Sequence, residues 1–238
     1  MNSSNIILFN ESNYIGSLDK KYIENSYSRV VELAFYNFIK RFFDIIIGFI
    51  GILFLIPLTI LVKIMNLLTG DTKPIIFKQK RIGKNGDAIY IYKFRSMVPN
   101  AEELLEKLMK EDPKIKEEYL TNKKLENDPR VTKTGKFIRR TSIDEFPQFI
   151  NVLKGDMSIV GPRPYLFREI DDMGFYYKYV INSKPGITGM WQVSGRNNVS
   201  FDKRLLLDQY YDNNKSIFLD TKIFFKTFKQ VVKKEGSK

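Results

Sequence analysis

The sequence contains no cysteine and no histidine. Structural zinc sites of the usual kind are therefore excluded, as are disulfide bonds and thiol nucleophiles. A Ser-His-Asp triad is excluded as well, because it needs an imidazole base. If the chain is an enzyme, its nucleophiles and proton-transfer groups must be carboxylates, lysine, tyrosine or hydroxyl groups.

Acidic residues are also scarce relative to basic ones. The chain has 27 Asp and Glu against 39 Lys and Arg, which gives a net charge of +12. Such an excess predicts an anionic partner, which could be nucleic acid, an anionic membrane surface or a phosphorylated small molecule. With 238 residues, 43% of them hydrophobic, the chain can form one well-buried domain plus an appendage and is not wholly disordered.

An uncharged apolar run covers residues 45–62, and its 18 residues are the lower limit for a membrane-spanning helix. Pro57 lies inside the run and lacks a backbone donor, so we expect a kink or a break there. Three structures fit: a kinked span, a helix hairpin that enters and leaves by the same face, or a buried helix of a soluble core. Residues 72–95 hold seven basic residues and one acid, which places everything after residue 63 in the cytoplasm.

Short apolar stretches follow the run. Residues 74–77 and 88–94 predict strands, joined in a hairpin by the KNGD turn at 84–87. Residues 142–153 predict a helix. Ser142 is its expected N-cap, and Glu145 is the expected capping-box partner of Ser142. A proline at position 147 means that this helix is bent or starts later.

The last predicted helix covers residues 217–234. Phe224, Phe225 and Phe228 recur in it at helical spacing, with five lysines among them. A basic amphipathic helix of this kind suits the interface of an anionic membrane. An ordinary surface helix that packs on the core fits the pattern equally well.

Two adjacent carboxylates, Asp144 and Glu145, lie among basic residues. Arg139 and Arg140 come just before them, and Arg163 follows in a stiff Gly-Pro-Arg-Pro turn. Cations screen an anionic substrate, so this setting suits reactions of phosphate esters with Asp as nucleophile. Paired carboxylates also suit Mg²⁺, which prefers oxygen ligands. On charge pattern alone, the pair could instead be an exposed helix start whose acids complement the helix dipole.

Several long blocks of the sequence, in this order, resemble one family: the bacterial sugar transferases that act on polyprenyl phosphate, the monotopic phosphoglycosyl transferases. The resemblance covers roughly residues 40–235. It rests on FKQKRIGKNG (77–86), IYKFRSM (91–97), RVTKTGKFIRRTSIDEFPQFINVLKGDMSIVGPRP (130–164), KPGITGMWQVSGRN (184–197) and LDQYYDNNKSIFLDTKIFFKTF (207–228).

The resemblance implies an enzyme of the undecaprenyl-phosphate hexose-1-phosphate transferase type. Such enzymes transfer a sugar-1-phosphate from a UDP-sugar to undecaprenyl phosphate and release UMP, the first membrane step of exopolysaccharide, capsule or O-antigen synthesis. The segment WQVSGRN resembles members that use a hexose phosphate, so galactose or glucose is expected. The alternative is an N-acetylhexosamine-1-phosphate transferase of the same family.

The family's Asp-Glu pair corresponds to Asp144 and Glu145. By this resemblance, Asp144 attacks the β-phosphate and holds the sugar phosphate covalently, and Glu145, together with Asp144, binds Mg²⁺. Four cationic side chains are expected to bind phosphate groups: Lys93, Arg95, Arg139 and Arg163. Two more residues are expected near the sugar or the nucleotide: Gln192 and Arg196.

The family's membrane element is a re-entrant helix broken at a proline, which corresponds to Pro57, so the hairpin is preferred to the span. The expected fold class is α+β: a re-entrant membrane helix hairpin, then a small, mostly helical cytoplasmic catalytic domain with a short β-hairpin and a basic amphipathic interfacial helix. The expected boundaries are 1–28 for a polar flexible tail, 29–69 for the amphipathic and re-entrant membrane helix, and 70–238 for the cytoplasmic phosphoglycosyl transferase domain.

The expected location is the cytoplasmic face of the cell membrane, in contact with anionic inner-membrane lipids. No nucleic-acid partner is expected, and a homo-oligomer is left open. A basic membrane- or nucleic-acid-binding module without chemistry is the alternative from a different class. Its weakness is that the charge comes in separate loops instead of one stripe. A scaffold that has lost its chemistry is disfavoured because Asp144 and Glu145 are both present.

Overall fold

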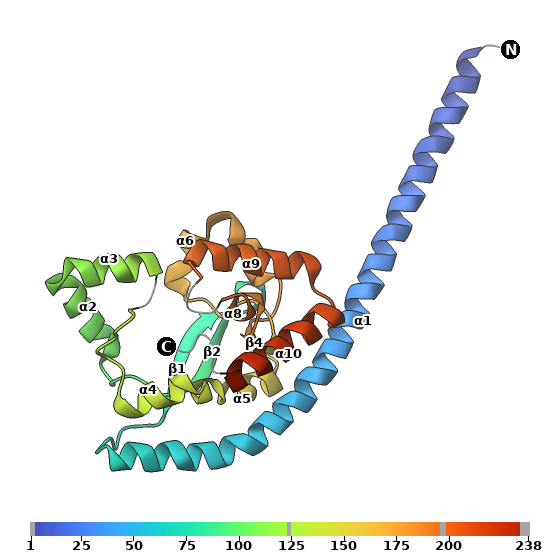
Figure 1. Ribbon diagram of the computed structural model, residues 1–238. Helices are drawn as coiled ribbons and strands as arrows, with labels where there is room; N and C mark the ends of the chain where they lie inside the picture. The colour runs from blue at the N-terminus through green and yellow to red at the C-terminus, as the bar shows by residue number, and fades with distance from the viewer. Residues whose placement is uncertain (1–2, 123–124, 196–198, 234–238) are drawn as a thin grey trace. The chain divides into compact units, whose positions relative to one another are not determined.

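The computed structural model describes residues 3–122, 125–195 and 199–233. The chain divides into two units, Met1–Phe42 and Phe43–Lys238. The first unit is the N-terminal part of helix α1 (Ser3–Leu68), and the second contains the rest of α1 and the elements that follow it (Figure 1). In chain order these are β1 (Ile76–Ile82), η1 (Lys84–Gly86), β2 (Ala88–Phe94), α2 (Ala101–Glu111), α3 (Pro113–Asn122), α4 (Lys133–Arg140), η2 (Ile143–Glu145), α5 (Gln148–Lys154), β3 (Ser158–Val160), η3 (Phe167–Glu169), α6 (Ile170–Met173), η4 (Gly174–Tyr176), α7 (Tyr177–Ile181), β4 (Gly186–Thr188), α8 (Met190–Val193), α9 (Phe201–Asn214) and α10 (Ile217–Lys233). A mostly helical chain with small sheets is compatible with the α+β class.

Helix α1 begins at Ser3, so most of the segment expected as a polar tail is helical. The segment contains no proline, and nothing in it blocks a helical backbone. The boundary between the two units, after Phe42, falls inside the range expected for the membrane element. The functional division at residues 28 and 69 stays a prediction.

At Pro57 the structure shows helix and not a loop. Because proline has no N–H, the carbonyl group of Leu53 lacks its usual helical partner. The hydroxyl of Thr59 donates to the carbonyl of Leu55 at 2.7 Å, a type of bond that often bends helices. The ribbon of α1 is curved in its last turns (Figure 1). Helix α1 is therefore unbroken at Pro57, and both the kink at this residue and the re-entrant path stay predictions.

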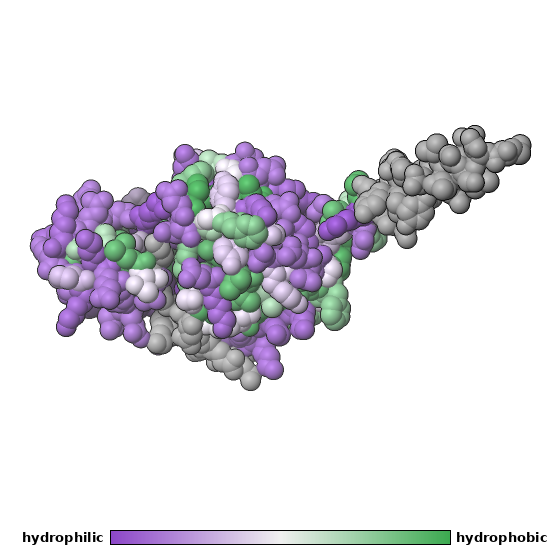
Figure 2. Space-filling model, turned by 90° about the horizontal axis from the view of Figure 1, so that it is seen from above, coloured by the Kyte–Doolittle hydropathy of each residue, from purple (hydrophilic) through white to green (hydrophobic). Residues whose placement is uncertain are grey.

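The part of α1 in the second unit is apolar and largely uncovered. Among the described residues, Ser28–Leu68 is long and apolar enough to cross a membrane: its most apolar window has a mean hydropathy of 3.0 and is 17% buried. Phe49, Phe54 and Ile56 are each more than half exposed. Water solvates such a surface poorly, so the helix is compatible with membrane association. By contrast, the face shown in Figure 2 is mostly hydrophilic.

The covered side of α1 packs closely on α5. A Cβ atom on Gly51 would lie 2.3 Å from the Phe149 ring, and one on Gly48 would lie 2.8 Å from Leu153. The close approach requires glycine at position 51, whereas at position 48 the flexible end of the Leu153 side chain would have to shift. Further along the helix, Val62 is completely buried in a cluster with side chains of β2 and α4.

Asp44 attaches α1 to strand β3. Its Oδ1 atom accepts hydrogen bonds from the Ser158 hydroxyl at 3.0 Å and from the Ile159 N–H at 2.8 Å. The Asp44 side chain is buried, so these bonds are shielded from water. They fix the position of the strand that leads directly into the Gly-Pro-Arg-Pro turn.

The predicted hairpin is confirmed. Strands β1 and β2 are antiparallel, with Ile76 opposite Phe94 and Ile82 opposite Ala88, so β1 extends beyond the predicted residues. The turn has positive φ angles at Asn85 (59°) and Gly86 (85°). Asn and Gly tolerate this left-handed conformation best, which explains the turn signal in the sequence.

A second, parallel pair of strands was not predicted. No strand was expected in the segments of β3 and β4, whereas the structure pairs Ser158 with Gly186 and Val160 with Thr188. Three-residue strands are too short to show a periodic pattern. Gly186 permits the pairing, because a Cβ atom there would lie 2.2 Å from the Gly161 nitrogen.

Helix α10 combines the two interpretations left open for it. Ile223 is buried in the main core, whereas Phe218, Phe225 and Phe228 are largely exposed. The helix therefore packs on the domain and also presents aromatic side chains outward. Contact of these rings with a membrane stays a prediction.

We expect Asp44→Ala to lower the free energy of unfolding by about 2 kcal/mol or more, because it leaves the Ser158 hydroxyl and the Ile159 N–H buried without an acceptor. Thermal unfolding in detergent measures this loss. Asp44→Asn keeps an oxygen acceptor and should lose less, as should the matched variant Ser158→Ala. Wild-type stability of Asp44→Ala would contradict the assigned role.

Candidate active site

Asp144 and Glu145 lie in η2, a short turn between α4 and α5. The neighbouring apolar residues Ile143 and Phe146 pack against the buried cluster that contains Val62 of α1. The apolar helix thus supports the turn that carries the two carboxylates. Both acidic residues are partly exposed at the surface of this cluster.

The backbone just before the pair is strained. Ser142 has φ 57° and ψ 18°, a left-handed conformation that is uncommon outside glycine. The capping-box prediction is wrong, since Ser142 makes no capping hydrogen bond. Helix α5 starts at Gln148 with Pro147 as its N-cap, which agrees with the later start that this proline indicated. A helix start tolerates proline because the missing N–H has no helical partner there.

Two cations act on the carboxylate pair. The Nζ atom of Lys93 lies 3.0 Å from Oε1 of Glu145. Arg139 donates from Nε to the Ser96 hydroxyl at 2.8 Å and attracts Asp144 electrostatically. Burial raises the pKa of Asp144 to about 6 and the nearby Glu145 adds to the rise, whereas Lys93 and Arg139 oppose it. Asp144 is therefore mostly ionised at neutral pH and more basic than an ordinary carboxylate, which suits a nucleophile.

A cavity lies beside Glu145. Its lining contains three cationic side chains and one carboxylate, so its charge favours an anionic ligand. The lining residues are Arg81, Ile91, Lys93, Glu145, Gln148, Arg163, Pro164, Gly186, Ile187, Trp191 and Gln192.

Trp191 lines this cavity, and two arginines lie against its ring. The guanidinium carbons of Arg163 and Arg204 lie 5.1 and 5.2 Å from the centre of its ring, within the range of cation–π attraction. Arg163 comes shortly after β3, and Trp191 comes shortly after β4. The unpredicted parallel strand pair is therefore what brings these two residues together.

Most of the predicted site residues gather here. Glu145, Lys93, Arg163 and Gln192 line the cavity. Asp144 is adjacent to Glu145 in η2, and Arg139 acts on Asp144. The predicted Arg196 lies outside the described residues.

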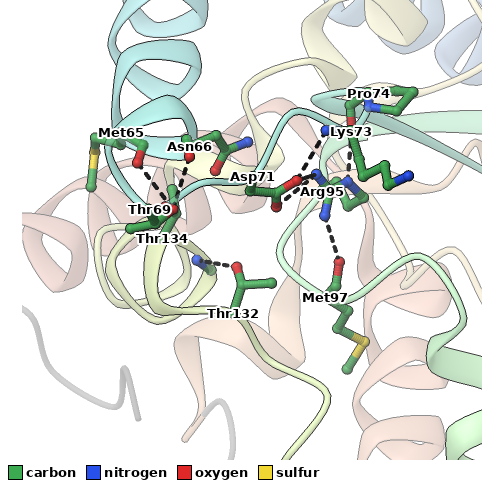
Figure 3. A network of polar contacts seen from close by, with 11 residues as sticks. Met65, Asn66, Thr69, Asp71, Lys73, Pro74, Arg95, Met97, Thr132 and Thr134 are labelled. Carbon is green, nitrogen blue, oxygen red and sulfur yellow. Dashed lines mark hydrogen bonds and ion pairs between the residues drawn. The ribbon is translucent and has the colours of Figure 1, made fainter.

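Arg95 is placed elsewhere. Its guanidinium donates to both carboxylate oxygens of Asp71 (2.8 and 2.9 Å) and to the carbonyl groups of Pro74 (2.7 Å) and Met97 (3.0 Å), as Figure 3 shows. These bonds lower the pKa of Asp71. Arg95 is buried in this network and is not among the residues that line the cavity, so the phosphate-binding role expected for it stays a prediction. It holds the segment between α1 and the hairpin in place.

Arg81, Gln148 and Trp191 line the cavity but were missed in the sequence. All three lie within the blocks that carry the family resemblance. For Arg81 a signal existed: strand alternation places it on the same face as Gln79, whose side chain accepts its hydrogen bonds.

The carboxylate pair fits a magnesium ion that shares its coordination with a ligand. No group of three or more potential metal ligands occurs among the described residues. Mg²⁺ is commonly bound by one or two carboxylates together with water and substrate phosphates. Asp144 and Glu145 therefore satisfy the protein's part of such a site.

A carboxylate pair beside a cationic cavity, on a unit that carries a long uncovered apolar helix, is suited to binding a phosphorylated anion at a membrane. Comparison of the sequence with protein families agrees with this class. The chain belongs to the bacterial sugar transferase family, whose pattern matches residues 35–234.

Curated relatives share the same region. The undecaprenyl-phosphate galactose phosphotransferase of Salmonella typhimurium is 44% identical over 201 residues, which are 84% of this chain and 42% of that protein. The exopolysaccharide production protein ExoY of Sinorhizobium fredii is 41% identical over 83% of this chain and 87% of its own length. An N-acetylgalactosaminephosphotransferase of Aeromonas hydrophila that acts on undecaprenyl phosphate is 36% identical over 90% of this chain and 48% of that protein. The chain thus spans less than half the length of the first and third of these relatives.

The carboxyl group of Asp208, in α9, is completely buried. It accepts a hydrogen bond from the Tyr165 hydroxyl at 2.7 Å. Burial raises the pKa of Asp208 to about 7, although the Tyr165 hydrogen bond and the charges of Arg163 and Arg204 oppose the rise.

The raised pKa of Asp208 predicts how stability depends on pH. The folded protein keeps this proton up to about pH 7, whereas an unfolded Asp loses it near 3.8, so the free energy of unfolding should fall as pH rises between these values. The fall should amount to a few kcal/mol. Asp208→Asn should remove it, which denaturant unfolding of both proteins at pH 4.5 and 7.5 measures. If the free energies of unfolding of the two proteins differ by the same amount at both pH values, the raised pKa assigned to Asp208 is refuted.

Proposed function

We propose that the chain is a phosphoglycosyl transferase that transfers a sugar-1-phosphate from a UDP-sugar to undecaprenyl phosphate and releases UMP. The observation that carries this proposal is the carboxylate pair in η2, beside a cationic cavity and packed on the apolar helix. Membership of the bacterial sugar transferase family supports it, as do the activities for which the Salmonella and Aeromonas relatives are named.

Asp144 is the nucleophile in this proposal. One of its carboxylate oxygens attacks the β-phosphorus of the donor, and the bond from that phosphorus to the bridging oxygen breaks, so UMP leaves with the electron pair. The product is an aspartyl phospho-sugar. A phosphate oxygen of undecaprenyl phosphate then attacks the same phosphorus and displaces the Asp144 carboxylate. The raised pKa of Asp144 supports this role, because a more basic carboxylate is a better nucleophile.

Cations lower the barrier to the attack of one anion on another. Lys93 and Arg163 line the cavity and would bind the diphosphate, and Arg139 would stabilise charge near Asp144. Lys93 pairs with Glu145 in the structure, and a bound diphosphate would compete for it. Mg²⁺ bound by Glu145 and Asp144 would neutralise charge on the diphosphate.

We assign the sugar to the hexoses, galactose or glucose. The segment WQVSGRN supports this choice, as does the galactose activity for which the Salmonella relative is named. The Aeromonas relative, an N-acetylgalactosaminephosphotransferase, keeps N-acetylhexosamine as the alternative. The reaction would be the first membrane step of exopolysaccharide, capsule or O-antigen synthesis, in line with the name of the Sinorhizobium relative.

In the membrane, we propose that α1 enters and leaves by the cytoplasmic face. Pro57 inside the helix and the basic residues after the helix support this path. The acceptor carries its phosphate at the membrane surface, and the contact between η2 and Val62 of α1 would keep Asp144 close to that surface. The exposed phenylalanines and lysines of α10 would add contacts with anionic lipids.

Asp144→Asn tests the reaction. We expect turnover to fall at least about a thousandfold, because the amide cannot act as the nucleophile, while UDP binding largely remains. UMP release from a panel of UDP-sugars, with lipid carrier and Mg²⁺, measures turnover, and mass spectrometry detects the phospho-sugar adduct on Asp144 in the wild type. The exposed Asp202→Asn is a matched control that should keep full activity. Full activity of Asp144→Asn would exclude Asp144 as the nucleophile.

The absence of cysteine makes the membrane path directly measurable. Single substitutions Ser28→Cys and Thr72→Cys place one thiol before and one after the apolar run. We expect a membrane-impermeant maleimide to label both from the cytoplasmic face alone, in inverted vesicles and not in intact spheroplasts. Labelling of the two positions from opposite faces would show a span instead.

A further inference from the structure

Four arginines are buried in the described part of the chain. Two of them are neutralised by the protein: Arg95 by Asp71 at 2.8 Å and Arg130 by Asp128 at 2.7 Å. Proteins normally pair buried charges in this way, because an unpaired ion in a medium of low dielectric constant is costly. The four are Arg81, Arg95, Arg130 and Arg204.

Arg81 differs, since its hydrogen-bond partners in the described part of the chain are neutral oxygens. Its Nε and Nη2 atoms donate to Oε1 of Gln79, and its Nη1 atom donates to the carbonyl of Pro164 at 3.1 Å. A guanidinium group has five N–H donors, so two of them are not used by these bonds. Among the described residues, no carboxylate lies within ion-pair distance of Arg81.

Arg81 also lines the cavity, and so does Arg163. Burial lowers the pKa of Arg81 to about 10, and repulsion from the Arg163 guanidinium adds to the fall, whereas Glu169 and Glu145 partly oppose it. Arg81 is still charged at neutral pH. An anion bound between the two arginines would offset both the cost of burying the Arg81 charge and the repulsion between the two guanidinium groups. Arg204 is also buried, but it stacks on Trp191 and is not part of the cavity lining.

We propose that Arg81 is a further substrate-binding residue, whose two uncommitted N–H groups act with Arg163 to bind the diphosphate of the nucleotide-sugar donor. This inference rests on the proposed function and names a residue beyond those assigned from the sequence. Gln79 holds the guanidinium plane in position, and Pro164, next to Arg163, ties the two arginines together. A planar fork with fixed orientation suits two phosphate oxygens better than a lysine would.

Trp191 provides the readout, because it is the single tryptophan of the chain and lies against Arg163 in the same cavity. Its fluorescence is followed while the full chain in detergent is titrated with UDP and, separately, with uridine. We expect Arg81→Gln to weaken UDP binding roughly ten- to a hundredfold and to leave uridine binding unchanged. Arg81→Lys keeps the charge and should weaken UDP binding less. Lys80→Gln removes the same charge from an exposed neighbour and is the matched control.

The comparison of UDP with uridine separates a phosphate contact from a structural one. Equal weakening of both ligands, or unchanged UDP binding, would overturn the proposal. If thermal unfolding shows that Arg81→Gln is not folded, the same comparison of UDP with uridine is made with Arg81→Lys. An increase in KM for undecaprenyl phosphate with UDP affinity intact would assign Arg81 to the acceptor and overturn the donor assignment. If the wild-type protein releases UMP but the Arg81 variants do not lose UDP binding selectively, only this inference is refuted. If the wild-type protein shows neither UDP binding nor turnover, the proposed function is refuted as well.

Discussion

The attachment of the last turns of α1 to the rest of the second unit is the contact on which the site depends. At one end of this stretch, Asp44 holds β3 through the Ser158 hydroxyl and the Ile159 N–H. At the other end, Val62 packs in the cluster that supports η2. One rigid apolar helix thus sets the relative positions of the carboxylate pair and of the strand that leads to Arg163. A helix that must avoid water on its uncovered side is at the same time the base of the active site.

The distribution of charge explains how one small unit can be stable and can also bind an anion. Arg95 and Arg130 are neutralised by carboxylates and fasten loops. Arg81 and Arg163 face the cavity instead, and the one carboxylate in its lining, Glu145, pairs with Lys93. The protein therefore leaves positive charge uncompensated in one place. Concentrating it there favours a phosphorylated ligand and discourages neutral ones.

Local sequence signals predicted local structure well. The Asn-Gly turn predicted the β1–β2 hairpin, and the carboxylates predicted at the site lie beside a cavity that contains Lys93 and Arg163. The pairing of β3 with β4 was not predicted, because each strand has its partner far away in the sequence, across more than twenty positions. Arg95, for which phosphate binding was expected, pairs with Asp71 of a different segment. No property of an isolated arginine tells which anion it will meet.

By itself, the sequence determined the chemical repertoire: no thiol and no imidazole, an adjacent Asp144 and Glu145, an excess of cations and one long apolar run. Blocks shared with a known family turned this repertoire into an expected reaction. Tertiary structure alone decided which cations serve the cavity, that Trp191 stacks against Arg163, and that α1 is helical through Pro57. The physical reason is that composition and short-range pattern set the charge and helix propensity of each segment, whereas the pairing of charges depends on distances that exist only after distant segments have packed together.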